Sequence, residues 1–353
     1  MRTRILPALV AALVSIATVG SADQPVPEAT GLLCPQPEAR AFDFWLGSWD
    51  VLNRNRSPDG VEFQETGGAT DLVYPVVGGC GVVEHWQGHA FSRFIDGFSV
   101  RSWDPGAREW LLVLLWPISG EPSFGELRGG FRHGRGEFSF ERVGPDGEPV
   151  LTRYTFSDVA PDSLRWENAT SHDGGRTWSG NWIMEFTRRP PLADGLWNGP
   201  SMTTRRCPGD EHRRFDRLLG EWAGSRADAG GESVPVTVEL VSILEGCAVL
   251  ERGRSPGRTW EAFRVRAFEP GAGRWVEYAL DSERRRLVRR EAAPGEDLVF
   301  QDVDPAGGKV TRTRWELAGE GPPRWIVEEA DGPEGPWSRR AVVSLDEPLG
   351  AAP

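Results

Sequence analysis

Hydrophobic and polar residues alternate along this chain in short runs. Residues 234–240 carry valine or leucine at every second position, and residues 263–267 place Phe, Val and Ala on one side of a strand with Arg264 and Arg266 on the other. A period of two is typical of antiparallel strands that bury one face and expose the other to water. Turn sequences such as Pro-Asp-Gly at 145–147 separate the runs. The pattern predicts an all-β sandwich or barrel, with the arginine face of residues 263–267 in water.

Helical signals are confined to two short segments. Residues 37–46 and residues 210–219 each predict a short helix that leads into a Gly-x-Trp sequence. Elsewhere the periodicity of an amphipathic helix is missing. Helices are therefore expected to make only a small contribution to this fold.

The chain repeats one set of landmarks in the same order. Cys34 and the sequence FDFWLGSW at 42–49 recur 173 positions later as Cys207 and FDRLLGEW at 215–222. The sequence GCGVVE that follows in the first half returns as GCAVLE in the second half. Landmarks that recur in one order indicate an internal duplication. We therefore predict two copies of one domain.

The duplication also sets the predicted boundaries. We expect a first domain at 30–189, a linker rich in proline and glycine at 190–204, and a second, degenerate copy at 205–348. Ahead of them, residues 1–22 combine basic residues, an apolar run and small residues, which is the pattern of a signal peptide cleaved after Ala22. A cleaved leader predicts a periplasmic or secreted protein. No later segment is apolar over the length needed to span a membrane.

Four cysteines follow the predicted leader, and an even number in an exported chain predicts two disulfides. Four cysteines allow three pairings. The duplication favours the pairing within each copy, Cys34 with Cys80 and Cys207 with Cys247. Each bridge would tie the segment before the first strand to an early strand, whereas an exchange between copies would require interlocked domains.

Three longer sequences carry a resemblance to a known family. These are FDFWLGSWDV at 42–51, GGCGVVEHW at 78–86 and SHDGGRTW at 171–178. They resemble uncharacterised lipocalin-like bacterial secreted proteins of the calycin superfamily, which are distantly similar to nitrobindin-type barrels. The resemblance covers nearly all of the first copy and most of the second. It implies two tandem antiparallel lipocalin-like β-barrels.

The resemblance also implies how one end of each barrel is closed. In calycins the tryptophan of the first strand packs against a basic side chain of the last strand, a role that Trp49 and Arg188 would fill here. The second copy has Glu347 at the position of that arginine. Either Arg339 or Arg340 substitutes for it, or this end of the second barrel is built differently.

Charge argues against one class of partner. The chain has 40 lysine and arginine residues against 52 aspartate and glutamate residues, a formal net charge of −12. A negative protein repels phosphate backbones, so nucleic-acid binding is not expected. The basic run at 284–290 predicts a solvated hairpin.

Differences between the two copies indicate where a site could have diverged. Aromatic residues shared by both copies are expected to pack the barrels. Trp86, Trp116 and Trp182 occur in the first copy alone, and we predict that they line a cavity. Glu84 and His85 are the adjacent polar candidates. Because the glutamate recurs in the second copy, buried hydrogen bonding is its expected role.

Metal and cofactor chemistry have weak support in the sequence. His85 and His89 form the one cluster that could hold a metal, but tetrahedral zinc needs three or four ligands. The nitrobindin resemblance raises ligation of haem by one histidine, but no histidine matches that family's axial ligand. The sequence at 171–178 matches an Asp-box, which predicts a turn capped by Asp173, since a propeller would need several such boxes. We predict neither a metal nor a cofactor.

The leading functional hypothesis is that the first barrel binds a small apolar or aromatic molecule, because small β-barrels can hold one such ligand. Two-barrel lipocalin-like proteins include hydratases, so one alternative is a hydratase-type enzyme for a hydrophobic, isoprenoid-like substrate, with Glu84 or His85 as the acid. A second alternative is that both barrels are filled and their outer faces bind another protein. The side chains inside the first barrel would distinguish these hypotheses.

Overall fold

The computed structural model describes residues 32–190, 207 and 209–350, apart from 58, 92, 117–121, 145, 296–297, 304–307 and 318–320. These described residues belong to one compact unit. The predicted signal peptide at 1–22 and the predicted linker, from residue 191 onward, lie outside the described residues.

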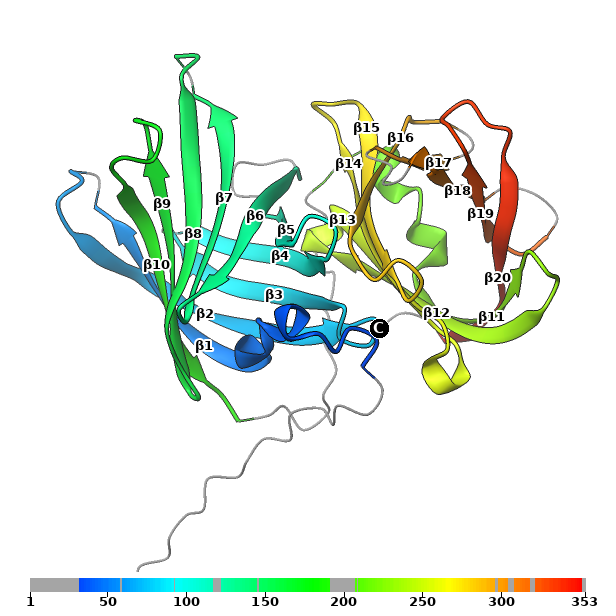
Figure 1. Cartoon of the computed structure of the whole chain (residues 1–353), viewed down its shortest axis with the longest axis horizontal. Helices are drawn as coiled ribbons and strands as arrows, with labels where there is room; N and C mark the ends of the chain where they lie inside the picture. The colour runs from blue at the N-terminus through cyan, green and yellow to red at the C-terminus, as the bar shows by residue number, and fades with distance from the viewer. Residues whose placement is uncertain are drawn as a thin grey trace, which may run out of the picture. The chain divides into compact units, whose positions relative to one another are not determined.

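The first half of the chain forms a closed antiparallel barrel (Figure 1). Each strand pairs with the next one along the chain, and the first strand closes the barrel by pairing with the tenth. The strands are β1 (Gly47–Arg56), β2 (Phe63–Val76), β3 (Gly81–Ala90), β4 (Arg93–Asp104), β5 (Glu109–Leu115), β6 (Phe124–Arg132), β7 (Arg135–Val143), β8 (Pro149–Ala160), β9 (Ser163–Ser171) and β10 (Ser179–Arg188).

The second half forms a second closed antiparallel barrel in the same up-and-down order. This confirms the predicted fold class of two tandem barrels. The strands are β11 (Gly220–Asp228), β12 (Ser233–Ile243), β13 (Ala248–Arg254), β14 (Glu261–Glu269), β15 (Arg274–Asp281), β16 (Val288–Ala292), β17 (Leu298–Asp302), β18 (Val310–Glu316), β19 (Arg324–Ala330) and β20 (Ser338–Gly350).

The two predicted helices are pairs of single 3₁₀ turns. The first pair is η1 (Pro37–Arg40) and η2 (Asp43–Trp45), and the second pair is η3 (Glu211–Arg213) and η4 (Asp216–Leu218). Each pair ends where a glycine with a φ of +123° opens the first strand of its barrel. Both copies share the phenylalanine of the FDxxLGxW sequence, which is Phe42 in the first copy and Phe215 in the second. The short turns place it inside its barrel, where it is fully buried. Two more 3₁₀ turns, η5 (Leu244–Gly246) and η6 (Pro256–Arg258), flank β13.

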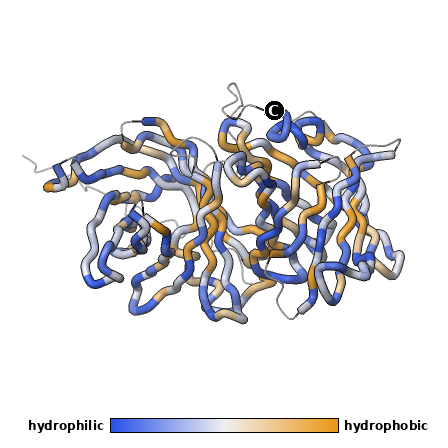
Figure 2. Tube along the Cα trace, turned by 90° about the horizontal axis from the view of Figure 1, so that it is seen from above, coloured by the Kyte–Doolittle hydropathy of each residue, from blue (hydrophilic) through white to orange (hydrophobic). Residues whose placement is uncertain are grey.

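Hydropathy alternates along the strands (Figure 2), and successive side chains of a strand point to opposite sides of the barrel wall. On β14 the two faces are the reverse of the prediction. Arg264 and Arg266 are buried inside the second barrel, whereas Phe263 and Val265 belong to a core cluster that also contains Phe98 of β4. The rings of Phe98 and Phe263 are nearly parallel, with centroids 6.4 Å apart. The apolar face of β14 is therefore buried against the first barrel, which leaves the arginines to fill the interior.

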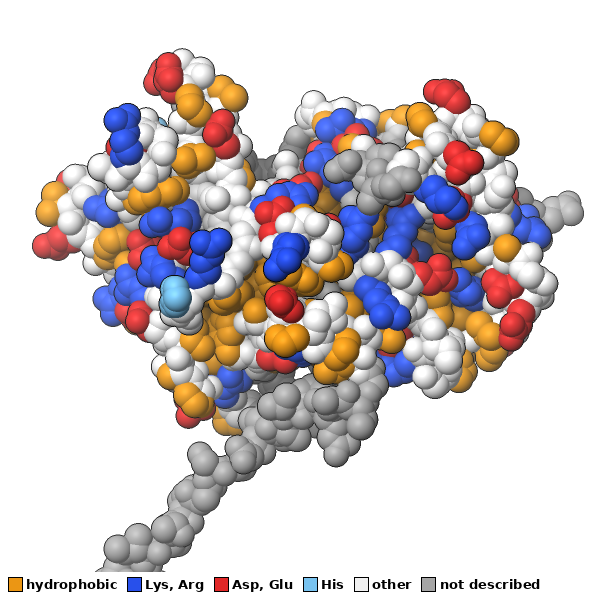
Figure 3. All heavy atoms as spheres, viewed as in Figure 1, with side chains coloured by type: hydrophobic (Ala, Val, Ile, Leu, Met, Phe, Trp, Pro, Cys, Tyr) orange, Lys and Arg blue, Asp and Glu red, His pale blue; other side chains and the backbone are white. Residues whose placement is uncertain are grey.

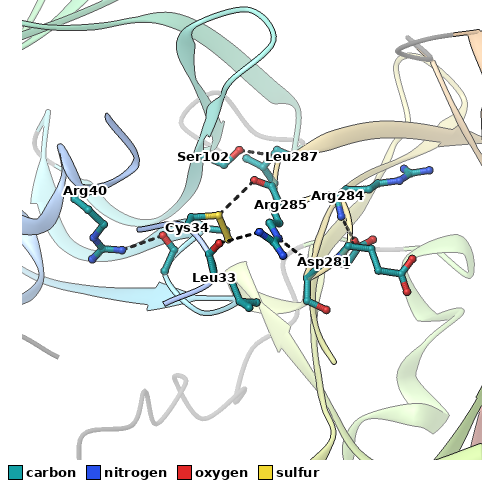
Figure 4. Close-up of a disulfide and its surroundings, with 12 residues drawn as sticks. Leu33, Cys34, Arg40, Ser102, Asp281, Arg284, Arg285 and Leu287 are labelled. Atoms are coloured by element: carbon teal, nitrogen blue, oxygen red, sulfur yellow. Dashed lines mark hydrogen bonds between the residues drawn. A yellow bond between two sulfur atoms is a disulfide. The ribbon is translucent and has the colours of Figure 1, made fainter. Parts of the chain in front are cut away.

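Both disulfides form within their own copies, which is the pairing that the duplication favours. The chain-entropy model gives each loop of this length about 4 kcal/mol of stabilisation. The Cys34–Cys80 bridge lies beside the β15–β16 turn of the second barrel (Figure 4). Arg285 of that turn donates to the carbonyl of Leu33 at 3.2 Å, and the amide of Leu287 donates to Ser102 Oγ at 2.8 Å.

The basic run at 284–290 is therefore not a solvated hairpin. In addition to the contact of Arg285 with Leu33, Arg286 pairs with Asp104 of the first barrel at 3.4 Å. Arg290 is buried inside the second barrel. On the face of the molecule in Figure 3, acidic and basic side chains are interspersed.

The two barrels are closed differently at the end where their first strand begins. In the first barrel the guanidinium of Arg188 lies 4.0 Å from the ring of Trp49 and donates to the carbonyls of Leu46 and Phe44, as the resemblance implies. In the second barrel Trp222 lies opposite Pro348, and among the described side chains no arginine stacks on it. This end of the second barrel is built differently.

Candidate functional site

The interior of the first barrel holds a cavity of about 330 Å³. This volume lies near the lower end of the range for small-molecule sites, about 300–1,000 Å³. The wall is mainly aromatic and aliphatic, with a few polar groups among the apolar ones. The lining residues are Trp45, Glu84, Phe91, Arg93, Arg101, Leu112, Leu114, Trp116, Tyr154, Phe156, Trp166, Asn168, Asn181, Trp182 and Met184.

Three tryptophans form one aromatic side of this cavity. The ring of Trp182 on β10 meets the rings of Trp116 and Trp166 edge to face, at centroid distances of 5.6 and 5.4 Å. Gly97 on β4 makes room for Trp116, because a Cβ atom at that position would lie 2.7 Å from its ring. Edge-to-face packing holds the rings in fixed orientations. The aromatic side is therefore a rigid surface.

The five residues predicted for the site occupy three kinds of position. Glu84, Trp116 and Trp182 line the cavity. Trp86 is fully buried and is not among the lining residues, but it packs against Trp116 at a centroid distance of 5.2 Å. His85 points away from the cavity, because successive residues of a strand face opposite sides. Its Nε2 lies 2.8 Å from Oδ1 of Asp96 on β4.

Glu84 is held by a buried ion pair that sequence reasoning missed. Arg101 on β4 is 1% exposed, and its Nη2 donates to Oε2 of Glu84 at 2.8 Å. Ser99 also donates to this carboxylate. The guanidinium of Arg101 lies 4.2 Å from the ring of Trp45. The buried hydrogen bonding expected of Glu84 is confirmed, and burial lowers the pKa of Arg101.

Arg101 keeps two further donors unused. Its Nε and Nη1 atoms are buried and have no hydrogen-bond partner among the residues that the structure describes. Trp116 Nε1, on the same cavity wall, is likewise buried and unpaired within the described chain. Leaving buried donors unpaired is costly. These unpaired donors belong to residues of the cavity wall.

Asp71 on β2 is the second ionisable group that sequence reasoning missed. It is 2% exposed, and neither carboxyl oxygen has a hydrogen-bond partner in the described part of the chain. Burial, followed by the nearby charge of Glu84, raises the pKa of Asp71 well above its ordinary value. The same two causes raise the pKa of Tyr154. Both shifts favour the neutral forms of these side chains beside the Glu84–Arg101 pair.

The interior of the second barrel is occupied by a network of ion pairs. Glu251, the counterpart of Glu84, accepts hydrogen bonds from Arg264 and Arg266. Arg266 also donates to Glu277, which in turn pairs with Arg290. These five residues are all at most 5% exposed. Burial would raise the pKa of Glu251, but the charges of Arg264 and Arg266 outweigh burial and hold it below its ordinary value.

Strand register shows why the two interiors differ. Opposite the shared glutamate, the first barrel has Ser99 and the second has Arg264. Opposite the shared arginine, the first barrel has Leu112 and the second has Glu277. On the next strand, Leu127 stands where the second barrel has Arg290. These exchanges remove the charges that would otherwise extend across the interior of the first barrel.

The Asp-box forms the structural turn that its sequence predicts. Asp173 accepts hydrogen bonds from Ser171 Oγ at 2.8 Å and from the amide of Thr177 at 2.9 Å. Trp178 closes the turn by donating to the carbonyl of Gly175. The hydrogen bonds from Thr177 and Ser171 lower the pKa of Asp173. These hydrogen bonds are made within the turn itself.

Within the described residues, no group of three or more His, Cys, Asp or Glu side chains is placed to hold a metal ion. The same part of the chain contains no helix long and apolar enough to cross a membrane.

Comparison with known proteins gives similarity in structure only. No protein-family model and no curated protein matches the chain. A protein of unknown function from the DUF3598 family of Nostoc punctiforme is 12% identical, with 88% of this chain and 99% of that chain covered and a TM-score of 0.26. Rv2717c from M. tuberculosis is 15% identical over 44% of this chain and 99% of its own, with a TM-score of 0.31.

The S-type phycobiliprotein lyase CPES from Guillardia theta is 13% identical, with 43% of this chain and 92% of that chain covered and a TM-score of 0.29. TM-scores this low carry no argument about function. The fold is established by the strand order of the two closed barrels.

Proposed function

We propose that the chain binds a small apolar or aromatic molecule inside its first barrel. The observation that carries this proposal is the cavity of about 330 Å³ with Trp116, Trp166 and Trp182 on one side. Aromatic and aliphatic walls with a few placed polar groups are typical of small-molecule sites. The cavity also counts against the packed-barrel alternative for this copy.

The proposal includes the place where the protein acts. The chain is an exported, lipocalin-like protein of the calycin type that functions in the periplasm or outside the cell. The two disulfides support export, because such bonds persist in oxidising compartments. Cleavage after Ala22 can be read directly from the N-terminal sequence of the purified protein.

The binding proposal is tested with N-phenyl-1-naphthylamine, an uncharged probe whose fluorescence rises in apolar surroundings. We expect saturable binding of one probe per full-length chain. Trp182→Ala should weaken it by about tenfold or more, since removing one large aromatic contact costs about 1.5–3 kcal/mol. Trp178→Ala is the matched control, because Trp178 belongs to the Asp-box turn and not to the cavity wall. Absence of saturable binding, or equal effects of the two variants, would contradict the proposal.

Catalysis of hydration is the second candidate function. Its support is that Glu84 is buried and faces the cavity, as a hydratase acid would need to. However, both Arg101 and Ser99 engage this carboxylate as an acceptor. A hydratase would add water to an unsaturated apolar substrate, and Glu84→Gln would abolish turnover while probe binding persists. Substrate recovered unchanged from the wild-type chain would remove this candidate.

A further inference from the structure

The two barrels place one arginine in nearly the same surroundings. Arg101 donates from Nη2 to Oε2 of Glu84 at 2.8 Å, and Arg266 donates from Nη2 to Oε2 of Glu251 at 2.6 Å. Each guanidinium also lies over the phenylalanine of the FDxxLGxW sequence, at 4.9 Å in the first barrel and 4.7 Å in the second. The second barrel therefore serves as an internal reference for the first.

The arginines differ in the second partner of Nη2, which is Ser99 in the first barrel and Glu277 in the second, and in the state of the donor Nε. In the second barrel Arg266 Nε donates to Oε2 of Glu277 at 2.9 Å. In the first barrel Leu112 occupies the position of Glu277, so it offers no acceptor. Arg101 Nε is consequently unpaired with any described residue, although it is buried. Arg101 and Leu112 both line the cavity.

We infer that the ligand of the first barrel carries an acceptor oxygen that binds Arg101 Nε, in the place that Glu277 takes in the second barrel. This inference rests on the proposed binding function and specifies the ligand class. A hydrogen bond from a charged donor to this oxygen fixes one end of the ligand. The apolar remainder lies against Trp116 and Trp182.

Charge balance identifies the oxygen as an uncharged carbonyl oxygen. In the second barrel the carboxylate of Glu277 contacts both Arg266 and Arg290. In the first barrel Arg290 is replaced by Leu127, and Arg101 already pairs with Glu84 and lies near the carboxyl group of Asp71, so a ligand carboxylate would add a further anion beside this guanidinium. Burying a second anion there without a second cation is unfavourable. The ligand class is therefore an aromatic or apolar ketone, ester or amide.

Three naphthalene probes of similar shape test this inference by calorimetric titration of the full-length chain. These are 2-acetylnaphthalene, which has the carbonyl, 2-ethylnaphthalene, which lacks it, and 2-naphthoate, which is anionic. We expect the ketone to bind about ten- to a hundredfold more tightly than the hydrocarbon, the range for a hydrogen bond to a charged group. We expect naphthoate to bind more weakly than the ketone.

A pair of variants locates the effect at Arg101. Leu112→Gln supplies a side-chain acceptor where Glu277 stands in the second barrel, and it should bring the affinities of ketone and hydrocarbon close together. Leu112→Met, which has similar volume and no strong acceptor, should retain the preference of the wild-type chain.

Each failure has a distinct meaning. Equal affinities for ketone and hydrocarbon in the wild-type chain would overturn the inference and leave the binding function intact. A Leu112→Gln variant that keeps the ketone preference would also overturn it. Tightest binding of naphthoate would refute the uncharged oxygen. Binding of none of the probes would contradict the proposed function itself.

Discussion

Replacing Glu251 by glutamine perturbs the centre of the ion-pair network in the second barrel. Glu251 is fully buried and accepts hydrogen bonds from both Arg264 and Arg266. Without the carboxylate, two buried guanidinium groups lose their shared counter-charge. Breaking a buried pair in this way costs about 3–5 kcal/mol. For a barrel of this size the melting temperature should fall by about 10–20 °C.

Glu316→Gln is the matched control in the same barrel. Glu316 also accepts bonds from two arginines, Arg314 and Arg324, but its side chain is 25% exposed. Pairs in contact with solvent contribute about 0–1 kcal/mol, so this variant should melt within a few degrees of the wild-type chain. Thermal and urea unfolding, followed by circular dichroism, compare the two variants. Equal losses would refute the claim that burial makes the Glu251 network important for stability.

The pH dependence of the same network has a definite sign. The pKa of Glu251 is held below its ordinary value, and so is the pKa of Asp302, which pairs with Arg290 and Arg284. A carboxyl group whose pKa is lower in the folded state than in the unfolded state stabilises the fold at pH values above its unfolded-state pKa. This contribution to stability is lost as pH falls through the folded-state pKa. The second barrel should therefore become less stable on acidification below about pH 4.5. Glu251→Gln should reduce this dependence.

Three further predictions concern the first barrel. Asp71→Val should stabilise the first barrel by about 1–3 kcal/mol at neutral pH, because it removes a buried carboxyl group that has no hydrogen-bond partner among the described residues. The raised pKa of Asp71 makes the wild-type chain lose stability as pH rises above the ordinary aspartate value, so the gain measured by urea unfolding should be larger at pH 8 than at pH 4. An equal gain at both pH values would contradict this. Replacing Cys34 and Cys80 together by serine should lower the free energy of unfolding by about 2–5 kcal/mol, and an unchanged urea midpoint would be inconsistent with a structural disulfide. Arg188→Gln should cost about 2–3 kcal/mol through its stacking on Trp49 and its two carbonyl contacts, whereas a loss below about 0.5 kcal/mol would show that this barrel end is held in another way.

The barrel fold could be predicted from the sequence because its two strongest signals are local. Alternation of hydrophobic and polar residues with a period of two indicates strands, and the repeated FDxxLGxW and Gly-Cys sequences indicate the duplication. Alternation alone, however, does not say which face lies inside. On β14 the apolar face with Phe263 and Val265 is buried outside its own barrel, so Arg264 and Arg266 fill the interior. Only the contact with the first barrel reveals this.

The candidate site could be predicted in part. Comparison of the copies drew attention to Trp116 and Trp182, which have no aromatic counterpart and line the cavity. The same comparison treats shared residues as structural, so Arg101, which matches Arg266, was missed. Its importance comes from a missing partner, the exchange of Glu277 for Leu112 on the neighbouring strand. That signal becomes visible only when strand register is known.

The most direct test of the account is a crystal structure of the full-length chain with 2-acetyl-6-bromonaphthalene, with bromine located by anomalous scattering. The account predicts one bromine site inside the first barrel, next to Trp116 and Trp182, and a ligand oxygen within hydrogen-bonding distance of Arg101 Nε. It also predicts that the ion-paired interior of the second barrel takes up no probe. Bromine inside the second barrel, or a first barrel without bromine at saturating probe, would contradict it.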